Sequence, residues 1–399
     1  MTAGLSRAVR VAAGLGALAL LTSCNAVPDV LGGPADAGTP TAEAVVAPRL
    51  STNVQGTAVT VNSRVVATAA DGTFSAVTLR ARDGETAGST IPGTIAPDGT
   101  TWRAGALLEP ATTYVVVARV KDAAGKVVPL RTRFATQSLE GHQVFPSVAP
   151  LAGETVGIGM PVIVAFDAPV ADKARFEKRM RVTSKPAQTG AWHWLSDREV
   201  HWRPQSYWTP GTDVHVDLDL NSIPAGDGFY GQEDRDIDFH VGDAHVYKVN
   251  AQTHQMQVYS NGALLRTIPV TTGMPGFTTR SGTKVVVSKE RERTMDAETT
   301  GIKKTDPEYY RVEVEYAMRL TYSGEFIHAA PWSVESQGRA NVSHGCTGMS
   351  TENAAWLYAM TVRGDVVETV GTDVGMTLYN GYGDWNASFA DWQAGSALT

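Results

Sequence analysis

Cysteine and charge are both scarce in this chain. Only two of its 399 residues are cysteines, which excludes a disulfide-stapled scaffold and a zinc site built from cysteines alone. Charged residues make up 19% of the chain and the net charge is −7, so no basic field is present to attract a nucleic acid. We therefore expect a globular protein that binds no nucleic acid.

The N-terminal segment has an apolar run that is too short for a membrane helix. Residues 11–21 form a run of about eleven residues, whereas a helix that spans a bilayer needs about 20. Two arginines precede the run and Leu-Thr-Ser-Cys24 ends it, which is typical of a secretory signal with a bacterial lipobox. We expect residues 1–23 to be removed, Cys24 to carry a lipid at the outer face of the cytoplasmic membrane, and residues 24–48 to form a flexible tether. The alternative is an ordinary cleavable signal with an incidental cysteine.

Two stretches, 49–138 and 139–243, consist of short alternating apolar runs between turn signals. Tyr114-x-Val116-x-Ala118 in the first and Val214-x-Val216-x-Leu218 in the second have the period of two that is typical of half-buried strands. A longer pattern recurs with an offset of 100 residues: Trp102-Arg103, Pro110 and Thr112 match Trp202-Arg203, Pro210 and Thr212. The repeat predicts two tandem β-sandwich modules.

The histidines and acidic turns of these modules give no sign of chemistry. We expect His201, His215 and His240 to be surface or capping residues rather than ligands. The glycine-rich acidic loop from Asp227 to Asp234 has oxygen ligands for a cation, but such turns are usually only solvated. The modules are therefore predicted to be spacers without a metal site.

The stretch 244–371 is predicted to be a separate, mainly β domain with one helix. Asn261-Gly262 is a strong hairpin signal, and the three valines at 285–287 predict a further strand. Ser350 or Thr351 can cap a helix that Gly364 would end.

The C-terminal stretch, residues 372–399, contains two tryptophans, Trp385 and Trp392. We expect it to pack back onto the protein as a C-terminal subdomain, because free tails seldom expose tryptophans.

A reactive thiol is predicted in the glycine-rich segment Ser343-His344-Gly345-Cys346. Cys346 comes just before the predicted helix, where the positive end of the helix dipole favours the thiolate. The candidate bases are His344 and His328. Since a neighbour two positions away usually points elsewhere, we prefer His328, which ends a strand-like run. The alternative is a buried structural cysteine near two histidines.

These motifs resemble those of one enzyme family. His328, followed after fourteen residues by Ser343-His344-Gly345-Cys346, resembles the signature of the L,D-transpeptidases (YkuD type), and the run from Tyr322 to Ser333 is similar to mycobacterial members. The lipobox, the two modules and Gly383-Asp384-Trp385-Asn386 extend the resemblance over nearly the whole chain. It implies two tandem Ig-like β-sandwiches followed by a β-rich catalytic domain.

The resemblance also implies roles for individual residues. Cys346 would be the nucleophile and His328 the general base and acid. Ala329 stands where relatives often have serine, and its backbone carbonyl would orient the imidazole of His328. His344 would tune the thiolate or hold the loop. The N–H groups of Gly345 and Cys346 would form the oxyanion hole.

A lid and a substrate cleft are implied as well. Met295 to Tyr310 matches the family's lid, and Tyr310 would also help the oxyanion hole. Ser323-Gly324 on a facing strand and Ser343 would contact the substrate. Trp332 would either form a wall of the cleft or belong to the core.

One departure from the family pattern affects the substrate site. The family continues Cys-x-Asn, whereas Gly348 follows Thr347 here. The side-chain amide that is absent here could order the loop or hold substrate. We therefore expect its loss to change substrate preference and rate rather than reaction class.

The implied reaction is 3→3 cross-linking of peptidoglycan stem peptides through a thioester, with release of D-Ala and with no metal or organic cofactor. β-Lactams of the carbapenem type would be covalent inhibitors. One rival hypothesis, motivated by Gly348 and Ala329, is a non-catalytic protein that binds or scaffolds peptidoglycan with a degenerate transpeptidase fold. Another is an enzyme of the same class that hydrolyses stem peptides or attaches a protein to the wall.

Overall fold

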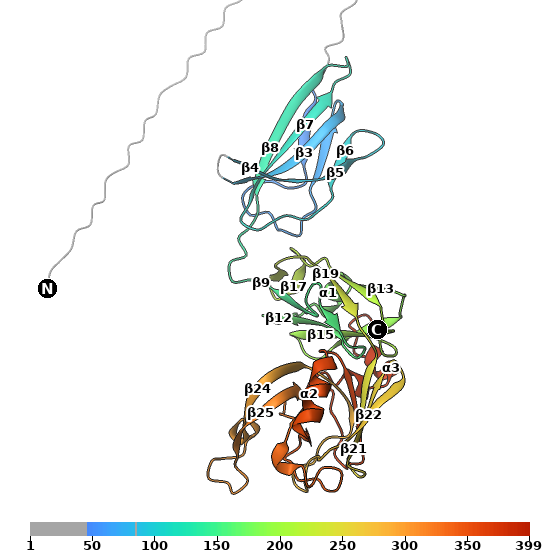
Figure 1. Ribbon diagram of the computed structural model, residues 1–399. Helices are drawn as coiled ribbons and strands as arrows, with labels where there is room; N and C mark the ends of the chain where they lie inside the picture. The colour runs from blue at the N-terminus through green and yellow to red at the C-terminus, as the bar shows by residue number, and fades with distance from the viewer. Residues whose placement is uncertain (1–45, 84–85) are drawn as a thin grey trace, which may run out of the picture. The chain divides into compact units, whose positions relative to one another are not determined.

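The computed structural model describes residues 46–83 and 86–399, and most of the ordered elements are strands (Figure 1). The predicted signal peptide, the predicted lipid-bearing Cys24 and the predicted tether as far as residue 45 lie outside the described residues. Within them, no helix combines the length and apolar character needed to cross a membrane. The mainly β fold class predicted from the sequence is confirmed.

The first sandwich consists of two four-stranded sheets around one apolar core, in blue to cyan in Figure 1. Alternate residues of its strands point inward, as in β7, where Tyr114, Val116 and Ala118 are buried. In order across each sheet, the strands are β1 (Arg49–Thr52), β2 (Val66–Ala70), β6 (Thr101–Ala104) and β5 (Gly93–Ile95), and β4 (Thr86–Ile91), β3 (Thr73–Asp83), β7 (Thr113–Lys121) and β8 (Val127–Ala135).

The second sandwich repeats this arrangement and adds a small third sheet and one short helix, α1 (Lys173–Glu177). Its sheets are β10 (Pro146–Ala149), β12 (Val162–Phe166), β15 (Glu199–Pro204) and β14 (Gly190–Trp194); β11 (Thr155–Val156), β19 (Arg235–Val241), β16 (Asp213–Leu218) and β13 (Met180–Lys185); and β17 (Pro224–Gly226), β18 (Phe229–Gly231) and β9 (Gln143–Val144).

The sequence repeat corresponds to a repeated packing unit. Trp102 lies on β6 and Trp202 on the equivalent strand β15, and each ring covers a glycine of the neighbouring strand. A Cβ on Gly93 would lie 2.2 Å from the ring of Trp102, and one on Gly190 would lie 2.3 Å from that of Trp202. The predicted boundary at 138/139 falls between β8 and β9.

The third domain packs a five-stranded sheet and a four-stranded sheet around a common core, with the helix α2 (Thr351–Met360) against β25 and β26. The sheets are β22 (Ala263–Pro269), β21 (Gln255–Ser260), β20 (His245–Asn250), β28 (Val366–Val370) and β23 (Gly282–Val285); and β24 (Ser288–Asp296), β25 (Arg311–Arg319), β26 (Phe326–Ala329) and β27 (Thr347–Met349). Two 3₁₀ turns are η1 (Ala297–Thr300) and η2 (Pro331–Ser333).

Two predictions for this domain concern its strands, a hairpin at Asn261-Gly262 and a strand at 285–287. Asn261 and Gly262 form the tight turn between β21 and β22, both with positive φ, so the hairpin is confirmed. The predicted strand at 285–287 is wrong beyond Val285, because Val286 and Val287 bond to Asp365 and Arg319 and connect β23 to β24.

The helix α2 begins as predicted but ends four residues early. The hydroxyl of Ser350 accepts from the N–H of Asn353 at the N-cap. The helix stops at Met360 because Thr361 is extended and the next N–H, of Val362, donates to the buried carboxylate of Asp365. Gly364, with φ of +97°, lies in the following turn rather than at the helix end.

The C-terminal tail, with η3 (Asp384–Asn386) and α3 (Phe389–Gln393), packs against the second sandwich. Trp392 is fully buried, stacks on His193 with ring centroids 4.5 Å apart, and donates to the carbonyl of Ala191. The guanidinium of Arg203 lies over the rings of Trp385 and Trp392.

The prediction of a surface or capping role is wrong for His201. Its ring is buried and bonds to the carboxylate of Asp384 in the tail (2.6 Å) and to Glu199 (3.0 Å). Burial acts to lower the pKa of His201, but the two carboxylates outweigh it and raise the pKa to about 9. His201 therefore holds the tail on the sandwich as a buried cation.

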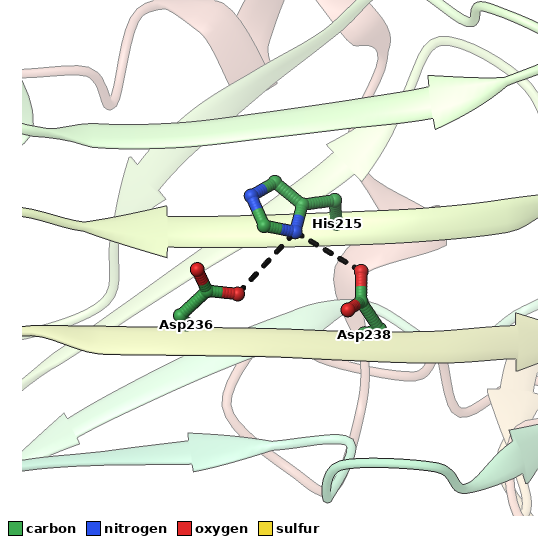
Figure 2. A group of neighbouring side chains, drawn as sticks. All are labelled: His215, Asp236 and Asp238. Carbon is green, nitrogen blue, oxygen red and sulfur yellow. Dashed lines mark hydrogen bonds and ion pairs between the residues drawn. The ribbon is translucent and has the colours of Figure 1, made fainter.

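His215 and His240 are half-exposed residues of the same sandwich. Figure 2 shows His215 on β16 beside Asp236 and Asp238 of β19, at 3.5 and 3.0 Å. All three side chains are solvent-exposed, and within the described residues this is the group whose spacing would suit a cation. In the acidic loop from Asp227 to Asp234, which we expected to be only solvated, Asp234 accepts from the N–H of Asn221.

Candidate active site

A cavity of about 430 Å³ opens between the β24–β25 hairpin and the segments around 330–348. It contains both halves of the predicted catalytic pair, Cys346 and His328. Its walls are mainly apolar, and none of the lining residues is Asp, Glu, Lys or Arg. The lining residues are Thr271, Met295, Tyr310, Val312, Val314, His328, Ala330, Trp332, Ser333, Ser336, Val342, Ser343, His344, Cys346 and Gly348.

Strand pairing puts Cys346 and His328 on the same face of the four-stranded sheet. On β26, Ile327 and Ala329 point into the core that the two sheets share, so His328 points to the opposite face, where the cavity lies. β27 runs parallel to β26 with His328 beside Gly348, which places Cys346 two residues away on the same face. Both side chains line the cavity, and Gly348 between them on β27 adds no side chain to it.

The imidazole of His328 is held in one orientation. Its Nδ1 lies 2.8 Å from the carbonyl oxygen of Ala329 and therefore carries the proton that is donated there, which leaves Nε2 as the basic nitrogen. Burial lowers the pKa of His328, and the bond to Ala329 only partly opposes this. The ring is thus neutral and able to accept a proton at neutral pH. The contact with Ala329 is the one that the family resemblance implies.

The predicted ionised state of Cys346 is wrong for the resting site. The side chain is 7% exposed and its thiol donates to the carbonyl of Gly324 at 3.6 Å. Burial raises the pKa of the Cys346 thiol to about 12, despite an opposing contact with the N–H of Phe326. The helix does not lower it, because β27 lies between Cys346 and α2 and the dipole field acts only over about one turn.

His344 joins the nucleophile loop to the predicted lid. Its Nε2 lies 3.1 Å from the carboxylate of Glu308 in the lid, and its ring lies against Tyr310 at the end of the lid (4.8 Å) and against Phe277 (4.4 Å). Both histidines line the cavity, but His344 is engaged by the lid on one side and by the Phe277 ring on the other. Met295 lies on β24 at the other end of the lid and also lines the cavity.

The predicted oxyanion donor at Gly345 is already occupied. The N–H of Gly345 donates to the hydroxyl of Ser343 at 3.2 Å, and that hydroxyl donates to the carbonyl of Cys346 at 2.6 Å. Gly345 has φ of +113°, and its carbonyl accepts from Thr279. The glycine therefore serves the turn, and the prediction that its N–H forms the oxyanion hole is wrong for this conformation.

Ser323 and Gly324 do not lie where the sequence predicted. They form the turn between β25 and β26 instead of a facing strand, because Thr321 bonds to Glu325 and closes a tight turn. Neither lines the cavity, and Ser323 bonds to Asn380 of the tail. Gly324 contributes its carbonyl, which accepts from the thiol.

Trp332 is 60% exposed and its ring centroid lies 6.0 Å from that of His328, so the alternative of a core role is excluded and it forms a wall of the cavity.

Gly348 fits closely between its neighbours. A Cβ at this position would lie 2.9 Å from the Cβ of Ala330 and 3.1 Å from Cγ2 of Thr271, both closer than ordinary packing. The N–H and carbonyl of Gly348 both pair with the backbone of Thr271. A side chain here, such as the family's Asn, would have to displace the cavity wall.

Sequence reasoning missed a buried ionic group behind the thiol. The carboxylate of Glu325 lies 2.5 Å from Nζ of the buried Lys284 and 2.9 Å from the guanidinium of Arg280. One signal could have indicated it: Glu325 comes directly before β26, a strand in which every residue is buried. A charge buried in this way needs charged or polar partners.

Two family models match this chain. Residues 56–224 match the bacterial Ig domain, and residues 244–369 match the L,D-transpeptidase catalytic domain, YkuD. The chain is 38% identical over 367 residues to L,D-transpeptidase 2 of Mycobacterium tuberculosis (strain CDC 1551 / Oshkosh), covering 91% of this chain and 88% of that protein. It is 35% identical over 337 residues to L,D-transpeptidase 5 of M. tuberculosis (strain ATCC 25618 / H37Rv), covering 82% and 72%.

A solved structure, LD transpeptidase LdtMt1 in complex with imipenem, is 38% identical and covers 56% of this chain and 97% of its own, with a TM-score of 0.51. Together, the paired strands that carry Cys346 and His328, the sandwiches ahead of them and the extent of these matches show that the chain belongs to the L,D-transpeptidase family.

Proposed function

We propose that the protein forms 3→3 cross-links in peptidoglycan through a thioester on Cys346. The observation that carries this proposal is the cavity in which the thiol and the neutral imidazole of His328 lie on one sheet face. Family membership supports a transpeptidase, and the residue roles below rest on the geometry.

The first step is acylation by a donor stem tetrapeptide. The thiol has a pKa of about 12, so attack on the donor carbonyl must be accompanied by transfer of its proton to Nε2 of His328. The new S–C bond forms as the C–N bond to the terminal D-Ala breaks, and the imidazolium returns the proton to the leaving amine. The carbonyl of Ala329 holds the ring while it is charged.

The second step reverses these roles. The side-chain amine of an acceptor stem attacks the thioester, His328 removes its proton, and the thiolate leaves and is reprotonated. Exclusion of water favours transfer over hydrolysis. The lid from Met295 to Tyr310, held to His344 through Glu308, would provide this exclusion. These residues accomplish both steps by proton transfer and orientation alone.

We further propose a lipid anchor at Cys24 that holds the protein at the outer face of the cytoplasmic membrane. The support is the N-terminal sequence alone, a short apolar run that ends in Leu-Thr-Ser-Cys. Two sandwiches between the anchor and the third domain would let the active site reach into the cell wall.

The test is a product assay with the unit from Val46 to Thr399, which is compact by itself and contains Cys346 as its single cysteine. Incubation with a disaccharide-tetrapeptide should give cross-linked dimer and free D-Ala by mass spectrometry, whereas Cys346→Ala should give neither. The complex of LdtMt1 with imipenem supports a carbapenem as a covalent inhibitor, so wild type should gain the mass of imipenem and Cys346→Ala should not.

Binding of peptidoglycan with no dimer, no tripeptide and no imipenem adduct would instead support the non-catalytic scaffold. Tripeptide with free D-Ala but without dimer would mean hydrolysis. A stable adduct on Cys346→Ala would refute the choice of nucleophile.

A further inference from the structure

A group of three charges, with Lys284 and Glu325 buried and Arg280 partly exposed, lies next to the nucleophile loop. Lys284 of β23 is fully buried, and its ammonium lies 2.5 Å from Oε2 of Glu325. The other carboxylate oxygen, Oε1, accepts from the guanidinium (2.9 Å) and from the backbone N–H (3.1 Å) of Arg280. We call Arg280, Glu325 and Lys284 the buried triad. One carboxylate between two cations leaves it with one net positive charge.

The triad is connected to both halves of the catalytic pair. Glu325 immediately precedes β26, the strand that carries His328, and its Cγ would lie 3.8 Å from a Cβ on Gly345. Thr279, the neighbour of Arg280, donates to the carbonyl of Gly345 at 2.8 Å. Because Lys284 belongs to the five-stranded sheet and Glu325 immediately precedes β26 of the four-stranded one, the ion pair joins the two sheets.

Stability alone does not account for such a group. Burying an ion pair costs several kcal/mol per ion in desolvation, and well-packed apolar residues are often as stabilising. A buried charged cluster next to a reactive group is a common sign of function. Burial lowers the pKa of Lys284, and the carboxylate of Glu325 opposes this, so the ammonium is retained by its partner.

We propose that the buried triad is a positioning and charge-setting group for Cys346, in which Lys284 supplies positive charge that stabilises the sulfur as it loses its proton to His328. The proposal rests on Cys346 being the nucleophile of the proposed function. It makes Lys284 a positioning residue, since it acts on the sulfur without touching substrate.

Three charged residues act on the sulfur of Cys346. Glu325 opposes thiolate formation, while Lys284 and Arg319 of β25 favour it. Tyr310 of the lid is neutral, since burial raises its pKa to about 12, and His328 is neutral as well. Since both rings are uncharged, Glu325, Lys284 and Arg319 are the charges that set the stability of the Cys346 thiolate. Removal of Lys284 therefore takes away a charge that stabilises the thiolate.

The experiment measures the thiol itself. The rate of alkylation of Cys346 by iodoacetamide is followed by mass spectrometry from pH 7 to 9.5 in the 46–399 unit, where no other cysteine competes. Lys284→Met should slow alkylation at each pH on the order of tenfold, since loss of one charge shifts a nearby group by about one pH unit. The double variant Lys284→Met/Glu325→Gln also removes the carboxylate, which opposes the thiolate more strongly than Lys284 favours it, so it should alkylate at least as fast as wild type.

The control is Lys289→Met. Lys289 is a half-buried lysine of β24 whose ammonium bonds to the carbonyls of Tyr358 and Thr361, and it is not among the charges that act on the thiol. This variant should leave the alkylation rate unchanged even if it lowers the melting temperature.

Two outcomes would overturn the proposal: an unchanged rate in Lys284→Met, or a double variant that alkylates as slowly as the single one, which is what mere packing damage predicts. If Lys284→Met does not fold, Lys284→Gln serves in its place. Its amide can still donate to Glu325, and about tenfold slower alkylation is expected from the same loss of positive charge. An unchanged rate there would likewise refute the triad. Alkylation needs no stem peptide, so failure of the proposed cross-linking reaction would be seen separately in the product assay.

Discussion

The protonation state of the resting site makes a sharp prediction for His328→Ala. With a thiol pKa of about 12, only about 10⁻⁵ of the protein carries a thiolate at pH 7, so acylation depends on proton transfer to the imidazole. General bases contribute roughly 10²–10⁴ in rate. We therefore expect His328→Ala to be acylated by imipenem at least about 100-fold more slowly than wild type at pH 7.

The pH dependence should differ as well. The pKa of His328 is lowered by burial, so wild type already holds a neutral base at pH 7 and its rate should be nearly flat from pH 7 to 9. Wild type should lose activity only as the pH falls through the lowered pKa of His328. In His328→Ala the thiolate is the sole reactant, so the rate should rise about tenfold per pH unit. The ratio of the wild-type acylation rate to that of His328→Ala should therefore fall about 100-fold between pH 7 and pH 9.

The assay is the time course of the imipenem adduct by mass spectrometry, with the melting temperature as a check on folding. A loss of less than tenfold at pH 7 would show that the base is another group. A variant rate that stays flat with pH would show that the sulfur reacts as a preformed ion, contrary to its burial.

Three further predictions test the rest of the site and its support. His344→Ala should reduce acylation less than tenfold, because its ring is engaged with Glu308 and the lid; a loss greater than that of the predicted base would reverse the assignment. Gly348→Asn should lower the free energy of unfolding by about 1–3 kcal/mol through overpacking of the cavity wall, and an unchanged denaturation midpoint would contradict this. His201 has a folded pKa of about 9 against 6.5 unfolded, so its contribution of about 3 kcal/mol is complete below pH 6.5 and lost as the pH rises through 9. Asp384→Asn leaves only Glu199 beside the ring and should therefore reduce this pH dependence in denaturant titrations; an unchanged dependence would contradict the assignment.

The sequence by itself determined many of the local elements and indicated the pair that we propose to be reactive. Alternating apolar residues and Asn261-Gly262 specify strands and a hairpin through contacts between near neighbours, and the structure contains both. The run from His328 to Ser343-His344-Gly345-Cys346 indicated the family by its resemblance to a known signature. The structure adds that parallel pairing of two short strands brings His328 and Cys346 to one face.

The tertiary structure alone decided the charge states. A helix downstream of Cys346 suggested a thiolate, but burial of the sulfur raises its pKa instead. His201 looked like an isolated surface residue, yet it lies beside Asp384, which is 183 residues away in the chain. Lys284 and Glu325 are 41 residues apart, and neither is unusual in its own segment.

The physical reason is the range of the forces involved. Backbone geometry and side-chain periodicity act over a few residues, so they can be predicted from the sequence. Desolvation and Coulomb interactions depend on which distant segments close around a group, and only the packed structure shows them.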